Sequence, residues 1–188
     1  LIALKKRVCH GAPMHLLADD GSYNLPYLNR YLPGEDLVLF CLAGREQGII
    51  SRKALSLEDL PEVRIVNRQK GSGTRILLDH LLGERGISPA SITGYDRELT
   101  THLAVALAVK TGEADAGPGV YSAAKAFGLS FTPLAREPYE LVFHADDWED
   151  PRAKALALAA TSRPFREALE RLGGYDVSVT GRLRRLPG

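Results

Sequence analysis

The sequence has little of what marks several large classes of protein. Only two of its 188 residues are cysteine, Cys9 and Cys41, too far apart for a metal-binding pair and too few for a disulfide framework, although a single bridge stays open. No apolar run approaches the roughly 20 residues that span a bilayer, and no basic segment with an apolar stretch and cleavage site opens the chain. We therefore expect a cytoplasmic protein without membrane insertion.

The chain also lacks an excess of charge of either sign. Lys and Arg number 24 against 23 for Asp and Glu, a formal net charge of +1. Such a balance supplies no broad positive field, so we expect no direct contact with nucleic acid, and any anion site must be local.

Signals for metal sites and for catalysis are missing as well. The histidines His10, His15, His80 and His144 show no zinc-type spacing, so no metal and no other cofactor is expected. No Gly-x-Ser-x-Gly elbow is present, and the carboxylates show no convincing pair for acid/base work. We therefore predict a binding domain with no catalytic residue.

What is present is a nearly regular alternation of strand and helix signals, which favours an α/β fold with mostly parallel pairing. The apolar run 36–42 predicts a buried strand. Thr100 or Thr101, Asp150 and Ser162 predict the starts of helices. The basic tail around Arg184 is interpreted as solvated. Further strands are expected at 63–66, 129–133 and 139–144, and further helices at the first residues, after Ser72 and at 120–127.

The residues Gly71-Ser72-Gly73-Thr74-Arg75 carry the main chemical signal. They follow a predicted strand and begin a helix, where unpaired N–H groups, two hydroxyls and the helix dipole favour an anion. Arg68 or Arg75 could add a forked contact, and the sequence does not choose between them. The alternative is that Ser72 simply caps the helix and the glycines serve the turn.

Three further residues are candidates for the same ligand. Arg45 lies where the apolar strand is expected to give way to a polar turn, and an interlobe hydrogen bond or salt bridge is an equal alternative. Thr101 and His102 begin a helix, and packing within the lobe is the alternative for His102.

The stretch Asn67-Arg68-Gln69-x-Gly71-Ser72-Gly73-Thr74-Arg75-x-Leu77-Leu78-Asp79 resembles the signature of the periplasmic-binding-protein-like domain family related to molybdate- and tungstate-binding proteins. The resemblance implies a two-lobed type II fold of mixed, mostly parallel sheets with flanking helices. We expect lobe I at 1–44 plus 143–188, and lobe II, with the anion loop, at 45–142. Such domains usually begin with a strand and a Ser-rich loop, which we expect to precede Leu1.

The resemblance also implies a function. Members occur alone or fused to helix-turn-helix DNA-binding domains or to molybdopterin-biosynthesis enzymes. We expect a sensor domain that captures molybdate, tungstate or a similar oxyanion as the effector part of a transcriptional regulator, with a homodimer left open. The alternative is an accessory or catalytic domain acting on a phosphorylated or pterin ligand. The expected ligand-binding residues are Ser72, Gly73, Thr74, Arg75, Arg45, Thr101 and His102.

Overall fold

The computed structural model describes residues 1–188 and divides into two compact units. Unit 1 consists of Leu1–Arg45 and Glu137–Gly188, and unit 2 of Glu46–Arg136. The chain leaves unit 1 within strand β2 (Leu37–Ser51) and returns within strand β6 (Ser130–His144). Each unit has its own hydrophobic clusters and is described separately.

The remaining elements follow in chain order. Unit 1 contains α1 (Ile2–Lys5), β1 (Gly11–Met14), α2 (Leu25–Tyr31), α6 (Ala145–Trp148), α7 (Pro151–Thr161), α8 (Arg163–Leu172), β7 (Tyr175–Asp176), the 3-10 turn η3 (Val177–Val179) and β8 (Leu183–Leu186). Unit 2 contains η1 (Leu60–Glu62), β3 (Asn67–Arg68), α3 (Gly73–Glu84), η2 (Pro89–Ser91), β4 (Glu98–Leu99), α4 (His102–Thr111), β5 (Ala116–Val120) and α5 (Tyr121–Ala126). None of these helices is long and apolar enough to cross a membrane.

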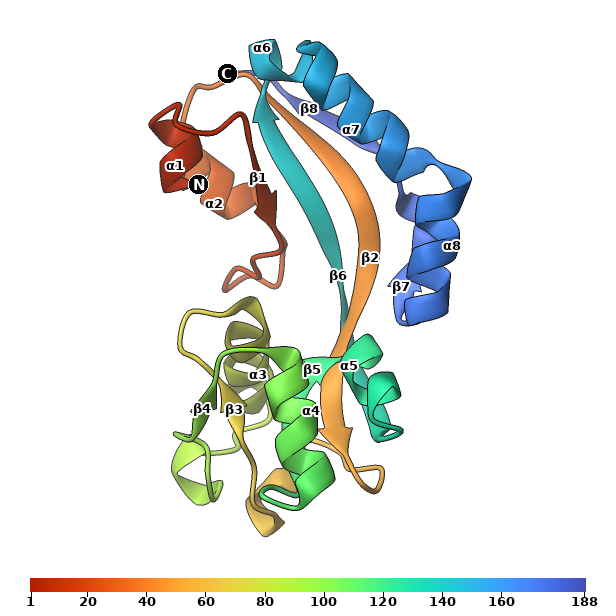
Figure 1. Cartoon of the computed structure of the whole chain (residues 1–188). Helices are drawn as coiled ribbons and strands as arrows, with labels where there is room; N and C mark the ends of the chain where they lie inside the picture. The colour runs from red at the N-terminus through yellow and green to blue at the C-terminus, as the bar shows by residue number, and fades with distance from the viewer. The chain divides into compact units, whose positions relative to one another are not determined.

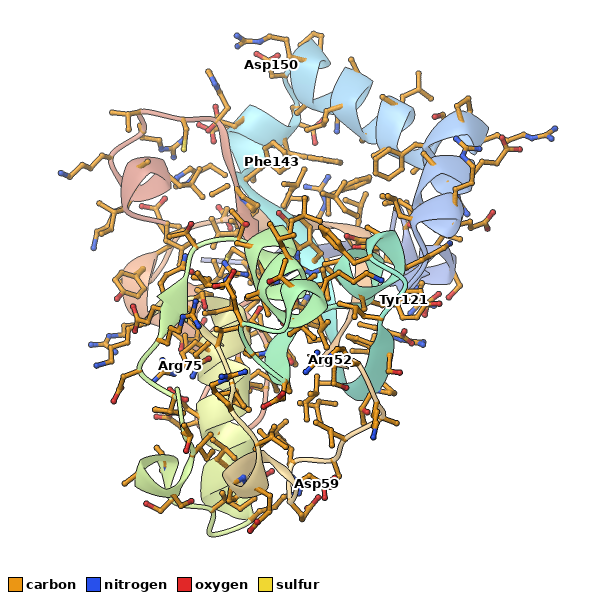
Figure 2. The ribbon with its side chains drawn as sticks, turned by 60° about the horizontal axis from the view of Figure 1, so that its bottom comes forward. Arg52, Asp59, Arg75, Tyr121, Phe143 and Asp150 are labelled. Carbon is orange, nitrogen blue, oxygen red and sulfur yellow. The ribbon has the colours of Figure 1, made fainter.

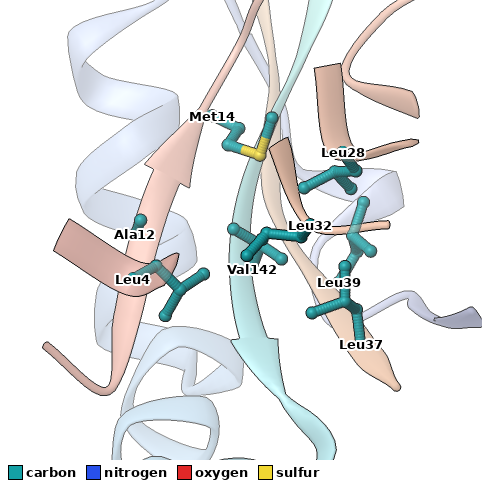
Figure 3. Packing of buried hydrophobic residues seen from close by; sticks show 8 residues of the cluster. All are labelled: Leu4, Ala12, Met14, Leu28, Leu32, Leu37, Leu39 and Val142. Carbon is teal, nitrogen blue, oxygen red and sulfur yellow. The ribbon is translucent and has the colours of Figure 1, made fainter. Parts of the chain in front are cut away.

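The first half of β2 is buried on both faces, which explains its unbroken apolar sequence. Leu37 and Leu39 join the cluster formed with α1, α2 and β1 (Figure 3). Val38 and Phe40 join the opposite cluster, where Trp148 packs between Phe40 and Phe143. Helices α1 and α2 therefore cover one side of these strands and α6 and α7 the other (Figure 1). The predicted buried strand is confirmed.

The predicted mixed α/β fold with flanking helices is confirmed, but the expectation of mostly parallel pairing is wrong. Strand β1 pairs with β6, and β5, β7 and β8 pair with β2, all antiparallel. A continuous apolar run indicates that both faces of a strand are covered, but it does not indicate the direction of the neighbouring strands. Parallel pairing occurs in unit 2, between β3 and β4 and at the bridge from Ile65 to Ala116.

Unit 2 carries helices on both faces of its strands. Leu78 and Leu82 of α3 pack in one cluster with Ile49 and Ile65. On the other face, α4 and α5 contribute Ala106, Ala123 and Ala124 to a second cluster with Ile50. This arrangement holds α3 and α4 against β3 and β5.

The predicted helix starts are confirmed by their caps. The side chains of Thr101, Asp150 and Ser162 accept hydrogen bonds from the backbone N–H groups of Ala104, Arg152 and Phe165. Figure 2 shows Asp150 at the start of α7. Such a cap stabilises a helix by about 1 kcal/mol.

Three local predictions are wrong. The polar turn expected near Arg45 is absent because β2 continues to Ser51. The two strands expected at 129–133 and 139–144 form one strand, β6, which continues through Pro133 and Pro138. The basic tail is the strand β8: it pairs with β2, and Arg184 binds the buried carboxylate of Glu140 at 3.0 Å.

Candidate functional site

The first turn of α3 offers free hydrogen-bond donors. Ser72 has extended backbone angles and caps the helix, with its Oγ accepting from the N–H of Arg75 at 3.3 Å. The N–H groups of Gly73 and Thr74 make no hydrogen bond within the protein, as expected for the first residues of a helix. The Thr74 hydroxyl has no partner either, although this residue is only 3% exposed. Two N–H groups and one hydroxyl are therefore left at the positive end of α3.

The first turn of α4 repeats the arrangement. Thr101 caps it, with Oγ1 accepting from the N–H of Ala104 at 3.0 Å and its carbonyl accepting from the N–H of Val105 at 3.2 Å. The N–H group of Leu103 has no acceptor in the helix. Because α3 and α4 both contact β3 and β5, unit 2 holds two helix N-termini on the same short strands.

Arg68 connects the end of β3 to the start of α4. Its side chain is buried and donates to the carbonyls of Leu99 and Thr100 at 3.2 and 2.9 Å. Its Nη1 lies 2.8 Å from Nδ1 and 3.1 Å from Nε2 of His102. A guanidinium cannot accept a hydrogen bond, so the nearer His102 nitrogen is the acceptor. Arg68 therefore places a fixed positive charge beside the N-terminus of α4.

Arg75 is directed away from the first turn of its own helix. Its Nε donates to both carboxylate oxygens of Asp79, at 2.8 and 3.0 Å, and its guanidinium lies 4.1 Å from the centroid of the Tyr95 ring. Tyr95 also donates to Asp79, and burial together with this carboxylate raises the pKa of the Tyr95 hydroxyl. Glu98 lies 3.6 Å from Nη1. Figure 2 shows Arg75 on α3. Its charge is balanced by carboxylates within unit 2.

Arg45 belongs to unit 1, where a buried carboxylate neutralises it. Its Nε donates to Glu137 at 2.6 Å, and Glu137 is 1% exposed. The Arg45 guanidinium lies 4.7 Å from the ring centroid of Tyr139, on which His15 stacks at 5.3 Å. Burial, with the charge of Glu137 nearby, raises the pKa of Tyr23 to about 12. Arg45 therefore forms a salt bridge, but with a residue of its own unit rather than the interlobe one that the alternative expected.

The structure thus groups five of the seven expected residues on two helix starts within unit 2, namely Ser72, Gly73, Thr74, Thr101 and His102. Sequence reasoning missed the pairing of Arg68 with His102, which no local spacing indicates. The four-residue spacing of Arg75 and Asp79 could have revealed their ion pair. No group of three or more His, Cys, Asp or Glu side chains is arranged to hold a metal ion.

Comparisons with known proteins agree with this fold. A family model described as "PBP superfamily domain" matches residues 1–161. The chain belongs to the PBP superfamily. It is 36% identical over 191 residues to the uncharacterized protein YvgK of Bacillus subtilis, covering 97% of this chain and 61% of YvgK. Over 53 residues it is 43% identical to the HTH-type transcriptional regulator CysL of Bacillus subtilis, covering 28% of this chain and 18% of CysL.

Solved structures of PBP-like proteins share the fold. A phosphate ABC transporter substrate-binding protein of Clostridium perfringens, with bound phosphate, superposes with a TM-score of 0.63 at 12% identity, over 93% of this chain and 82% of that one. The substrate-binding domain of a molybdenum ABC transporter from Clostridium difficile gives 0.59 at 14% identity, over 93% and 81%. The type II PBP-like fold expected from the resemblance is confirmed.

Proposed function

We propose that this PBP superfamily domain captures a small tetrahedral oxyanion, molybdate or tungstate, on the N-termini of α3 and α4. The observation that carries the proposal is the set of unpaired donors there: the N–H groups of Gly73 and Thr74, the Thr74 hydroxyl, and the N–H group of Leu103. Donors at helix N-termini bind anions without needing a mobile charged side chain. The fold is shared with a phosphate ABC transporter substrate-binding protein and with the substrate-binding domain of a molybdenum ABC transporter.

Within this proposal the candidate residues have different roles. Thr74 and the backbone of Gly73 and Leu103 contact the ligand, while Ser72 and Thr101 fix the helix starts through their caps. Arg75 is assigned to positioning, because Asp79 already holds its guanidinium. Arg68, which the sequence left as the alternative to Arg75, supplies the positive charge.

We further propose that the domain is the effector part of a transcriptional regulator. The support is the segment that is 43% identical to CysL, an HTH-type transcriptional regulator. The test is to express the natural gene product and measure its binding to its own promoter DNA by fluorescence anisotropy. We expect the DNA affinity to change by about tenfold when molybdate is added at saturation. Equal affinities with and without molybdate and tungstate would contradict the regulator assignment.

Isothermal titration calorimetry with molybdate, tungstate, sulfate and phosphate tests the ligand site. Replacing Thr74 by valine removes one hydroxyl donor at nearly constant volume. Because a hydrogen bond to a charged group contributes about 1.5–3 kcal/mol, we expect Thr74→Val to weaken binding by roughly tenfold to a hundredfold.

The matched control is Thr111→Val, at the other end of α4, where the hydroxyl bonds only to groups of its own turn and to Glu113. We expect this variant to bind like the parent protein. Absence of heat with all four oxyanions, or equal losses in the two variants, would refute the proposed site.

A further inference from the structure

Unit 1 contains a cavity that the proposed anion site does not use. It measures about 260 Å³ and lies between α8 and the strands β2, β6 and β7. Figure 1 shows α8 beside β7. Its walls are formed by Leu42, Ala43, Arg45, Tyr139, Phe165, Leu169 and Tyr175. All seven residues belong to unit 1, whereas the donors of the anion site belong to unit 2.

The cavity exists because α8 does not pack closely on the strands. Phe165 and Leu169 are four residues apart and therefore share a face of the helix. No residue of α8 is fully buried, although this face is directed at the strands. Protein interiors are normally close-packed, so an apolar helix face above a cavity of this size marks a place that a ligand can fill.

The walls combine aromatic rings with unpaired polar groups. The ring of Tyr139 is fixed by stacking on His15 at 5.3 Å and by the Arg45 guanidinium at 4.7 Å. Tyr175 is held by the pairing of β7 with β2 opposite Arg45. Neither the Tyr139 hydroxyl nor the Tyr175 hydroxyl makes a hydrogen bond within the protein, and Nη1 of Arg45 has no acceptor. A ligand can therefore pack against Phe165 and Tyr175 and still meet hydrogen-bond donors.

The charge of the cavity selects against an anion. Nε and Nη2 of Arg45 both face the carboxylate of Glu137, which is 1% exposed and balances the guanidinium. A second carboxylate would share Arg45 with this buried one and would gain little. An uncharged acceptor can take the free Nη1–H without such repulsion.

We infer that this cavity is a second ligand site that binds an uncharged molecule with a single aromatic ring and one acceptor oxygen, such as an aromatic amide. The size agrees with this class, because an apolar cavity of about 150 Å³ holds benzene and the present one leaves room for one substituent. The inference does not depend on the oxyanion site.

Titration of the ¹⁵N-labelled protein with benzamide, followed by amide chemical shifts, tests the inference. We expect saturable shifts centred on Ala43, Leu169 and Tyr175, and binding of benzoate weaker by about tenfold or more. The variant Leu169→Trp places an indole in the cavity and is expected to abolish these shifts. The matched control, Leu172→Trp, changes the same residue type on the same helix at a position that is 50% exposed and outside the cavity, and it should bind benzamide normally.

The outcomes separate the two sites. Molybdate is expected to shift amides of the first turns of α3 and α4 in both tryptophan variants, so a failed oxyanion site leaves the benzamide result interpretable. No benzamide shift up to its solubility limit, shifts that persist in a folded Leu169→Trp protein, or tighter binding of benzoate than of benzamide would each overturn the inference.

Discussion

The ion pair of Arg75 and Asp79 is unequal in burial, and this inequality predicts which half of it can be removed at lower cost. The Arg75 side chain is 3% exposed and that of Asp79 is 43% exposed. Removing the carboxylate in Asp79→Ala leaves a buried guanidinium with the Tyr95 ring, the Arg68 carbonyl at 3.5 Å and the Glu98 carboxylate at 3.6 Å. Loss of one partner of a fully buried pair costs about 3–5 kcal/mol, so we expect about 2 kcal/mol for this partly solvated pair.

Removal of the other partner is expected to cost less. In Arg75→Met the methionine fills the space of the arginine stem, and Asp79 returns to water. The losses are a cation–π contact and a half-exposed ion pair, together about 1 kcal/mol. The double variant should resemble Arg75→Met alone, because the buried charge that made the loss of Asp79 costly is gone. The single changes should therefore be clearly non-additive.

Urea denaturation followed by far-UV circular dichroism, together with hydrogen exchange of the α3 amides, measures these differences. The exchange data are needed because Trp148, the single tryptophan, belongs to unit 1 and reports on that unit. As a control, Glu58→Ala breaks the exposed pair of Glu58 with Arg85 in unit 2 and should leave the unfolding midpoint unchanged. If Arg75→Met destabilised the protein as much as Asp79→Ala, the assignment of burial to the arginine side would be wrong.

Three further predictions concern unit 1. Burial, with Glu140 nearby, raises the pKa of Cys41 from 9.0 to about 11. The stability that the protonated thiol contributes is therefore complete below pH 9 and is lost as the pH rises toward 11. Cys41→Ala should flatten the fall of the urea midpoint over this pH range. Asn24 is fully buried at φ 65°, accepts from the N–H of Leu16 and donates to Glu140, so Asn24→Ala should lower the unfolding free energy by about 3 kcal/mol. Asn24→Gly relieves the backbone strain but also lacks the amide, so it should still lose most of this free energy. Ser162→Ala should cost about 1 kcal/mol in a thermal melt through loss of the α8 cap, and a melt identical to that of the parent would contradict this role.

Local signals in the sequence were sufficient for much of the fold. A helix cap requires one short polar side chain and an N–H group two or three residues later, so Thr101, Asp150 and Ser162 could be located without tertiary information. The apolar run before Arg45 predicted a strand covered on both faces, because a continuous run of apolar residues is itself a local signal. The proposed anion loop could be located because its donors lie within a single helix start.

Features that depend on distant residues were not accessible in this way. Glu137 lies 92 positions from Arg45, and no spacing in the sequence indicates that this carboxylate neutralises it. The tail strand β8 was missed because Arg184 reads as solvated until its pairing with β2 and its contact with Glu140 are known. Strand β6 was divided in the prediction because Pro133 and Pro138 lack an N–H group, and only the paired structure shows that the strand continues.

The balance of charges in unit 2 has a consequence for ligand choice. Arg75 is held by Asp79, and Arg68 is fixed by two carbonyls and by His102, so neither cation can move to follow a ligand. The donors that remain at the first turns of α3 and α4 are N–H groups and the Thr74 hydroxyl, which are neutral and rigidly placed. Such donors can bind any small oxyanion through the same hydrogen bonds. Under the proposed function, discrimination among molybdate, sulfate and phosphate must then come from the size of the ligand and from whether its oxygens carry protons. A protonated oxygen cannot accept from a donor N–H along the same direction.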